Sequence, residues 1–170
     1  VQDIVEKNGG KLVWSKTGHS LIKSKMRSEK ILLAGEMSGH LFFADEFYGF
    51  DDALYAAGRL LRAIGAGKKL EQTLESFPVY FNTPEIRLDC MEEKKDGIVQ
   101  KVKKHFLEKY PSSITIDGIR VVFPHGWGLV RKSNTQAKLI LRFEADSKKE
   151  LEKIREEITG FLHPLLVPES

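Results

Sequence analysis

The stretch GWGLVRKSNTQAKLILRFEAD, residues 126–146, holds two apolar runs separated by a short polar segment. The runs WGLVR (127–131) and KLILRFEA (138–145) are rich in branched and aromatic side chains, which favour strands. The segment between them contains Ser, Asn and Thr, which are frequent in turns and loops. The stretch therefore predicts two strands joined by a polar loop.

Three patterns upstream of this pair extend the predicted sheet. EIRLDC (85–90) alternates apolar and polar residues, which predicts a strand. Residues 94–110 carry apolar side chains on one helical face, and Pro111 ends that helix. The stretch SITIDGIRVVF (113–123) predicts a β-hairpin with a tight Asp-Gly turn.

A helical pattern follows the pair of strands, in SKKELEKIREEITGFL (147–162). Ser147 at the N-cap and Glu150 three residues later form a capping box. Residues 85–170 are therefore predicted to form an α+β domain, with about four mostly antiparallel strands and two helices.

The N-terminal half alternates helical and strand patterns. These are, in order, a helix end at 1–8, a β-type run at 11–15, a helix at 19–27, a buried strand at 31–35, an apolar strand at 41–43 and a helix at 51–64 that starts at Asp51 or Asp52. The alternation predicts an α/β layer. The set is incomplete, because a sheet of four or more strands would need residues before position 1.

The incomplete sheet has a structural consequence. We expect an unpaired strand edge or an apolar face within residues 1–75, covered by a partner chain, a neighbouring molecule or a missing segment. A closed, solvated sheet there would contradict the predicted boundary. A further amphipathic piece spans about 68–76, and SFPVYFNTP (76–84) has two prolines and no periodicity, which is typical of a linker. The predicted domains are therefore 1–75 and 85–170.

The composition excludes several classes of protein. The chain of 170 residues is 41% hydrophobic and 30% charged, which is typical of globular proteins. No apolar run approaches the roughly 18 residues of a membrane span, and no secretory signal is visible, so we expect a cytoplasmic protein that contacts no membrane. The single Cys90 excludes an internal disulfide and a Cys-rich zinc site. The net charge of +3 is spread evenly, which argues against a nucleic-acid partner.

Polar side chains interrupt the apolar run LLAGEMSGHLFF (32–43). In extended backbone, Glu36, Ser38 and His40 would share one face. A carboxylate can accept from two hydroxyls, while Ser and His both donate and accept, so this face suits a polyol. The alternative is a polar loop that caps its own strand end.

Two further segments contain candidate anion ligands. Lys16, Gly18 and His19 precede a predicted helix, where a phosphate could bind, although a lone His after glycine is more often structural. In the loop between the last two strands, the candidates are Arg131, Ser133, Asn134 and Thr135. Arg131 can form a fork to phosphate, and successive N–H groups around Asn134 could form an anion nest. A plain polar hairpin loop is the alternative. No metal-ligand spacing is visible.

These motifs together resemble the α-D-phosphohexomutase family, most closely its bacterial phosphomannomutase/phosphoglucomutase members. GEMSGH (35–40) matches the family's sugar-recognition loop, and KTGHSLIK (16–23) is similar to its TGH segment. The stretch 126–146 is similar to the phosphate-binding loop of its last domain, and YGFDD (48–52) matches a further motif. The resemblance extends over nearly the whole chain.

The resemblance implies a fold and a set of roles. The family has four domains, and this chain is similar to the later part of domain 3, a truncated three-layer α/β/α domain, followed by all of domain 4. It implies that Glu36 and Ser38 bind sugar hydroxyls with help from His40, and that His19 lies near the reacting phosphate. The implied phosphate ligands are Arg131, Ser133, Asn134 and Thr135. Asn134 stands where many members have Gly, and Gln136-Ala137 where many have Glu-Pro or Thr-Pro.

The family's catalytic parts are absent from this sequence. The phosphorylated serine of domain 1 and the aspartate-rich Mg²⁺ loop of domain 2 have no counterpart here. The resemblance therefore implies that the full enzyme uses Mg²⁺ and a hexose 1,6-bisphosphate, and that its partners are a mannose or glucose phosphate and the N-terminal domains of the same protein. We expect this chain alone to be inactive, with no catalytic residue or metal site of its own and no bound cofactor. The alternatives are a stand-alone, non-catalytic sugar-phosphate binding module and, more remotely, a nucleic-acid or protein interaction domain.

Overall fold

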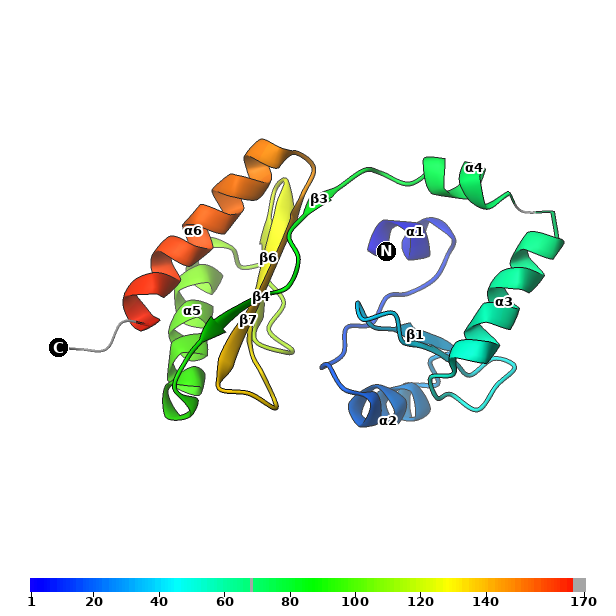
Figure 1. Ribbon diagram of the computed structural model, residues 1–170, viewed down its shortest axis with the longest axis horizontal. Coiled ribbons are helices and arrows are strands. Elements are labelled where there is room, and N and C mark those ends of the chain that lie inside the picture. The colour runs from blue at the N-terminus through cyan, green and yellow to red at the C-terminus, as the bar shows by residue number, and fades with distance from the viewer. Residues whose placement is uncertain (68, 167–170) are drawn as a thin grey trace. The chain divides into compact units, whose positions relative to one another are not determined.

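The computed structural model describes residues 1–67 and 69–166, and the chain divides into two compact units, Val1–Phe77 and Pro78–Ser170 (Figure 1). The first unit contains helices and a small sheet. Its elements are α1 (Gln2–Lys7), α2 (His19–Glu29), β1 (Leu33–Gly35), β2 (Leu41–Phe43), α3 (Ala53–Gly65) and α4 (Leu70–Glu75). β1 and β2 pair antiparallel, with Leu33 opposite Phe43 and Gly35 opposite Leu41.

The core of the first unit is small. It consists of Ile22 and Met26 from α2 and Phe42 from β2, with a few partly buried neighbours. The strand run at 31–35 was expected to be buried, but Leu33 is 58% exposed. Leu54 and Leu61 on α3 are also exposed, and no further strand pairs with β1 among the described residues. The first unit therefore has the exposed apolar surface and unpaired edge expected of a truncated α/β domain.

The start of α3 follows its sequence signals. Asp52 is the N-cap, and its Oδ1 accepts a hydrogen bond from the Tyr55 N–H (2.7 Å), which confirms the predicted helix start. Arg59 on this helix forms an ion pair with Asp45, with Nη2 2.8 Å from Oδ2. The hydrogen bond from Arg59 lowers the pKa of Asp45 to about 2, and the carboxylate in turn raises the pKa of Arg59. This pair holds α3 to the loop after β2.

One element predicted in the first unit is wrong. Residues 11–15 have no strand structure. A strand satisfies its N–H and C=O groups within a sheet, and residues 11–15 belong to neither of the two described sheets. Its apolar composition alone therefore did not determine its backbone.

The second unit is a helix-covered antiparallel sheet. Its elements are β3 (Phe81–Asn82), β4 (Ile86–Asp89), a 3₁₀ turn η1 (Glu92–Lys94), α5 (Lys95–Lys109), β5 (Ile119–Phe123), β6 (Gly126–Lys132), β7 (Lys138–Ala145) and α6 (Lys148–Leu166). The strand order is β3-β7-β6-β5. β4 also pairs with β7, further along that strand than β3, from Ile86 opposite Leu141 to Asp89 opposite Lys138. All pairings are antiparallel, which confirms the predicted α+β class.

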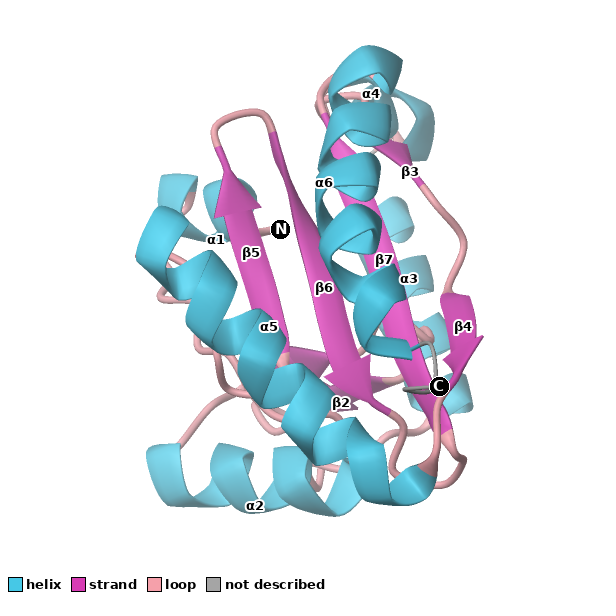
Figure 2. Cartoon of the chain, turned by 90° about the vertical axis from the view of Figure 1, so that its left-hand side faces the viewer, coloured by secondary structure: helices cyan, strands magenta, loops and turns pink. Residues whose placement is uncertain are grey.

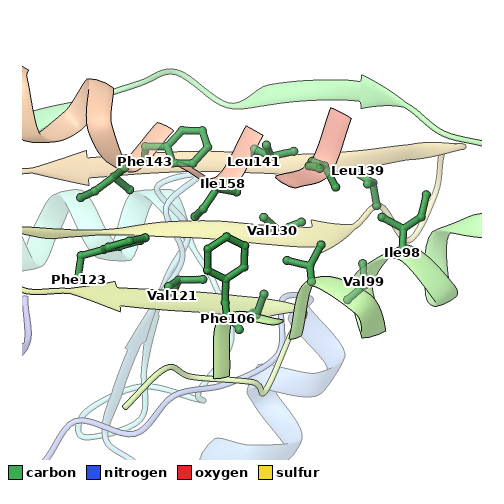
Figure 3. Packing of buried hydrophobic residues seen from close by; sticks show 14 of the residues in the cluster. Ile98, Val99, Phe106, Val121, Phe123, Val130, Leu139, Leu141, Phe143 and Ile158 are labelled. Carbon is green, nitrogen blue, oxygen red and sulfur yellow. The ribbon is translucent and has the colours of Figure 1, made fainter. Parts of the chain in front are cut away.

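The core of the second unit lies between this sheet and its two helices. Both α5 and α6 cross the same face of the sheet (Figure 2). Phe106 from α5 and Ile158 from α6 are fully buried and point toward Val130 and Phe143 on the strands (Figure 3). The α6 helix begins as predicted, because Ser147 Oγ accepts a hydrogen bond from the Glu150 N–H (3.2 Å).

Two predictions for the second unit are corrected. The segment 76–84 is not entirely a linker: Phe81–Asn82 pairs with the end of β7, and the buried Thr83 accepts a hydrogen bond from the Phe143 N–H through its Oγ1 (3.2 Å). The hairpin predicted over 113–123 is reduced to a single bridge between Ile114 and Arg120, which leaves a longer loop than a two-residue Asp-Gly turn. The chain turns at Gly118, at φ +70°, where a Cβ would lie 2.2 Å from the Val130 carbonyl oxygen on β6. Both the positive φ and the close contact with β6 therefore require glycine at this position.

No helix among the described residues is both long and apolar enough to cross a membrane.

Candidate functional site

The loop between β1 and β2 is a tight connection formed by residues 36–40. The Glu36 N–H donates to the His40 carbonyl oxygen (2.9 Å), and the Gly39 N–H donates to the Glu36 carbonyl oxygen (3.0 Å). Gly39 has φ +90°, a conformation that side chains with a Cβ rarely adopt. The backbone is therefore turned, and the expectation of an extended run with alternating faces is wrong, because the chain must reverse between two paired strands.

The turn nevertheless brings the three predicted side chains together. Ser38 Oγ lies 2.7 Å from His40 Nδ1 and 3.4 Å from Glu36 Oε2. His40 Nδ1 lies 3.5 Å from the same Glu36 oxygen. The side chains of Glu36, Ser38 and His40 thus form one connected polar group at the tip of the hairpin.

The start of α2 adds two residues to this group. Gly18, at the N-cap of α2, donates its N–H to Glu36 Oε1 (3.1 Å). His19 Nε2 lies 3.7 Å from Glu36 Oε2, and the rings of His19 and His40 are 4.5 Å apart, edge to face. The structure therefore unites Gly18 and His19 with the loop residues. Lys16 is exposed, and its side chain is not among the described contacts of this group.

Asp51 is a member of the group that the sequence did not indicate. Its Oδ1 lies 3.2 Å from His19 Nδ1, and its backbone pairs with Phe42 of β2 in an isolated bridge. In the sequence it appeared as a possible helix start and within the motif YGFDD, with no role in the site, and Asp52 is the N-cap of the helix instead. We name the group formed by Gly18, His19, Glu36, Ser38, His40 and Asp51 the hairpin cluster.

The hairpin cluster is open to solvent on one side. The His19 and His40 side chains are 42% and 43% exposed, while the Glu36 side chain is only 12% exposed. A ligand can therefore reach both imidazoles, and the less exposed carboxylate of Glu36 lies next to them. The donor set does not fit Mg²⁺, which prefers about six oxygen ligands in octahedral geometry.

The second candidate site is the loop that joins β6 to β7, residues 133–137. The Ser133 N–H donates to the Lys138 carbonyl oxygen (2.9 Å). Ser133 is buried, and its Oγ accepts hydrogen bonds from the N–H groups of Thr135 (3.3 Å) and Gln136 (3.1 Å). In this conformation these two N–H groups are used within the loop, so they do not form the expected anion nest. Asn134 and Thr135 are exposed at its tip.

Arg131 precedes this loop at the end of β6. Its guanidinium makes one long hydrogen bond, from Nη1 to the Lys132 carbonyl oxygen (3.4 Å), and the residue is partly exposed. It makes no second hydrogen bond to the part of the chain that the structure describes, so most of its N–H donors remain for a ligand. The structure places Arg131, Ser133, Asn134 and Thr135 on one strand end and loop, with Arg131 and the tip residues accessible and the Ser133 hydroxyl turned inward.

A buried lysine is hydrogen-bonded to the backbone of this loop. Lys95, at the first position of α5, is 3% exposed. Its Nζ donates to the carbonyl oxygens of Ser133 and Gln136, both at 2.9 Å, and lies 2.8 Å from Glu92 Oε2. Buried ammonium groups are rare unless they are paired in this way. Lys95 was missed in the sequence because it stood in a run of ordinary helix-start charges.

The two loops are thus built for different chemical groups. The hairpin cluster offers a carboxylate and imidazoles suited to hydroxyls, and the β6–β7 loop offers a guanidinium and exposed polar tips suited to an anion. The first loop lies on an α/β unit and the second on an α+β unit.

The chain belongs to the phosphoglucomutase/phosphomannomutase family. Residues 1–80 match the family model described as "Phosphoglucomutase/phosphomannomutase, alpha/beta/alpha domain III", and residues 85–160 match the one described as "Phosphoglucomutase/phosphomannomutase, C-terminal domain". The family resemblance seen in the sequence is thereby confirmed.

Individual relatives agree with the family models. A phosphomannomutase/phosphoglucomutase of Pseudomonas aeruginosa is 47% identical over 148 residues, which cover 86% of this chain and 32% of that protein. A phosphoglucomutase of Neisseria gonorrhoeae is 44% identical over 153 residues, 89% of this chain and 33% of that protein. A solved structure of a phosphoglucomutase/phosphomannomutase family protein from Burkholderia thailandensis superposes with a TM-score of 0.84 at 39% identity, covering 95% of this chain and 34% of that one. The chain spans about a third of the length of the curated relatives it matches.

Proposed function

We propose that this chain is the C-terminal, substrate-binding part of a phosphomannomutase/phosphoglucomutase. The observation that carries the proposal is the convergence of Glu36, Ser38 and His40 at the tip of the β1–β2 hairpin, within the motif GEMSGH of this family. Neighbouring sugar hydroxyls both donate and accept hydrogen bonds, and this group offers an acceptor carboxylate beside two groups that do both. Residues 1–75 would then be the later part of domain 3, 76–84 the connection and 85–170 domain 4.

The proposed reaction belongs to the full enzyme. A phosphoserine outside this chain would transfer its phosphoryl group to a hexose 1-phosphate, giving a hexose 1,6-bisphosphate and free serine. After the bisphosphate has turned, its other phosphoryl group would return to serine and leave hexose 6-phosphate. Neither a phosphoserine loop nor an aspartate-rich metal loop is present in these 170 residues, so we expect Mg²⁺ to be held elsewhere and the chain alone to be inactive.

Each loop here would take one part of the hexose phosphate. Glu36, Ser38 and His40 would bind sugar hydroxyls, and His19 would approach the phosphate that reacts. Arg131, Asn134 and Thr135 would bind the phosphate that does not react, and Ser133 would shape the loop through its internal hydrogen bonds. We expect the full enzyme to be cytoplasmic.

Titration of the ¹⁵N-labelled chain with glucose 1-phosphate and mannose 1-phosphate tests the binding roles. We expect amide shifts at residues 35–40 and 131–136, reduced in the first loop by Glu36→Ala and in the second by Arg131→Ala. Arg155→Ala, an exposed guanidinium on α6, is the matched control and should leave both sets of shifts unchanged. An absence of shifts at either loop up to millimolar ligand would contradict the proposal.

Extending the chain distinguishes the mutase from a stand-alone binding module. If the preceding domains are joined to it, we expect hexose phosphate interconversion that depends on Mg²⁺ and a bisphosphate. If the natural protein lacks those domains, the chain would be a non-catalytic sugar-phosphate binding module.

A further inference from the structure

The hairpin cluster contains three side chains with the donor set of a transition-metal site. His19, Glu36 and His40 each offer one ligand atom, and these atoms all lie within 4.8 Å of one another. Glu36 Oε2 is 3.7 Å from His19 Nε2 and 3.5 Å from His40 Nδ1. In a tetrahedral Zn²⁺ site, with bonds of about 2.0–2.1 Å, ligand atoms lie about 3.3–3.4 Å apart. Movements of a few tenths of an ångström would therefore bring the measured pairs to metal-binding separations.

The groups behind the three ligand atoms are arranged to orient them. Asp51 Oδ1 lies 3.2 Å from His19 Nδ1, so it can accept that proton and leave the lone pair on Nε2 facing Glu36. The other oxygen of Glu36, Oε1, accepts the Gly18 N–H at 3.1 Å, which leaves Oε2 directed toward both imidazoles. Metal-binding histidines commonly donate their second N–H to a carboxylate in this way, and ligating carboxylates are commonly hydrogen-bonded as well.

The chemical type and the exposure of the three ligand atoms determine which metal ions they suit. Two imidazole nitrogens and one carboxylate oxygen suit Zn²⁺ and Co²⁺, and they do not suit Mg²⁺ or Ca²⁺, which prefer oxygen. Both imidazoles are more than 40% exposed, so an ion can enter and keep a water molecule as its fourth ligand. Ser38 Oγ, now 2.7 Å from His40 Nδ1, would turn its hydroxyl away from that nitrogen as the metal binds.

We propose that His19, Glu36 and His40 bind one divalent transition-metal ion of the Zn²⁺ type, with Asp51 as the residue that orients His19. The site lies wholly within the first unit, and the proposal does not depend on any mutase activity or on sugar binding.

Calorimetric titration of the metal-free 170-residue chain with ZnCl₂ alone tests the proposal. We expect one Zn²⁺ per chain and no competition from millimolar Mg²⁺. His19→Ala and His40→Ala should each weaken binding by at least about tenfold, and Asp51→Asn should weaken it less than either. His125→Ala is the matched control: this exposed histidine also pairs with a carboxylate, Asp146 at 2.8 Å, but it is not part of a described three-ligand group. Its removal should leave the affinity unchanged.

Three results would overturn the proposal: no Zn²⁺ binding, equal affinity in the parent and in His19→Ala, or displacement of Zn²⁺ by Mg²⁺. The amide spectrum of residues 1–66 checks that each variant stays folded. If a variant does not stay folded, CoCl₂ added to the parent chain tests the site instead. We expect an intense visible absorption typical of low coordination number and paramagnetic broadening of the His19 and His40 ring signals. Broadening confined to other histidines would contradict the site.

Discussion

Lys95 Nζ lies 2.9 Å from the carbonyl oxygen of Ser133, a residue 38 positions later in the chain. The same ammonium reaches Gln136, so one buried charge fixes both ends of the turn that presents Asn134 and Thr135. A binding loop keeps its shape more precisely when buried side chains are hydrogen-bonded to it than when it has no such support. The shape of the β6–β7 loop therefore depends on the start of α5.

Replacing Lys95 should loosen this loop. Lys95→Met removes both hydrogen bonds and leaves two carbonyl oxygens without their donor, which should cost about 1–3 kcal/mol in the free energy of unfolding. Urea denaturation measures that loss, and amide hydrogen exchange at residues 133–136 should accelerate. Lys95→Arg should recover part of the protection, because a guanidinium can also donate to both oxygens. Lys101→Met, an exposed lysine on the same helix, should change neither quantity. Unchanged exchange in Lys95→Met would show that the loop holds its own shape.

Gly118 should not tolerate a side chain. Its φ is +70°, and an added Cβ would lie 2.2 Å from the Val130 carbonyl oxygen and 2.6 Å from Arg131 Cα. Both contacts are with the backbone of β6, which cannot move aside easily. Gly118→Ala should therefore destabilise the chain by about 1–3 kcal/mol through strain and overpacking.

Gly160 provides the opposite case for comparison. It lies within α6, and an added Cβ there would meet nothing within 4 Å. Gly160→Ala should stabilise the chain by about 0.5–1 kcal/mol, because alanine is the better helix former. Urea denaturation of both variants measures the contrast. Equal effects of the two substitutions would contradict the close approach of Gly118 to β6.

The Asp45–Arg59 pair should make the first unit sensitive to acid. The pKa of Asp45 is lowered to about 2 in the folded chain, against about 3.9 in an unfolded one. A carboxyl whose pKa is depressed by folding contributes stability above its unfolded pKa, and this contribution is lost as the pH falls through the folded pKa. The contribution should therefore be complete above about pH 4 and disappear toward pH 2.

Amide hydrogen exchange in α3 between pH 5 and pH 2, corrected for intrinsic rates, measures this dependence. Asp45→Asn should weaken the protection of the α3 amides at pH 5. It should also make that protection depend less on pH. The exposed Asp3 on α1 offers a control, since Asp3→Asn should leave the profile of α3 as it is in the parent chain. If the protection of α3 in the parent chain does not change between pH 5 and pH 2, the Asp45–Arg59 ion pair does not contribute to it.

Cys90 should react slowly in the folded chain. It is 8% exposed, and burial raises the pKa of its thiol, so less of the reactive thiolate is present at neutral pH. Alkylation by iodoacetamide at pH 7.5 should be at least about tenfold slower in buffer than in urea, as followed by mass spectrometry. Equal rates in the two conditions would mean that the segment before η1 opens readily.

The sequence predicted the elements whose signals are local. The strands of β6 and β7, the Asp52 cap of α3 and the Ser147 cap of α6 follow from side-chain pattern and capping alone. It failed where distant pairing decides the backbone. Phe81–Asn82 form a strand because β7 extends far enough to pair with them. Residues 11–15 do not form a strand, since they belong to neither of the described sheets.

The candidate site shows the same division. Glu36, Ser38 and His40 lie close together, but a turn, and not the strand alternation expected from the sequence, brings them together. Asp51 and Lys95 were missed, because their importance arises from contacts with residues 32 and 38 positions away, His19 and Ser133. No local pattern distinguishes such a residue from an ordinary surface charge.

The cores of the two units differ greatly in size, and this determines what a melting experiment can detect. Among the described residues, three buried side chains form the core of the first unit and seventeen that of the second. Unfolding of such a chain need not be a single cooperative transition. Both units contain helices of similar total length, so circular dichroism should show the first unit unfolding as a step of its own, below the melting temperature of the C-terminal unit. The residues of the hairpin cluster should lose their arrangement in that earlier step, while the C-terminal unit is still folded.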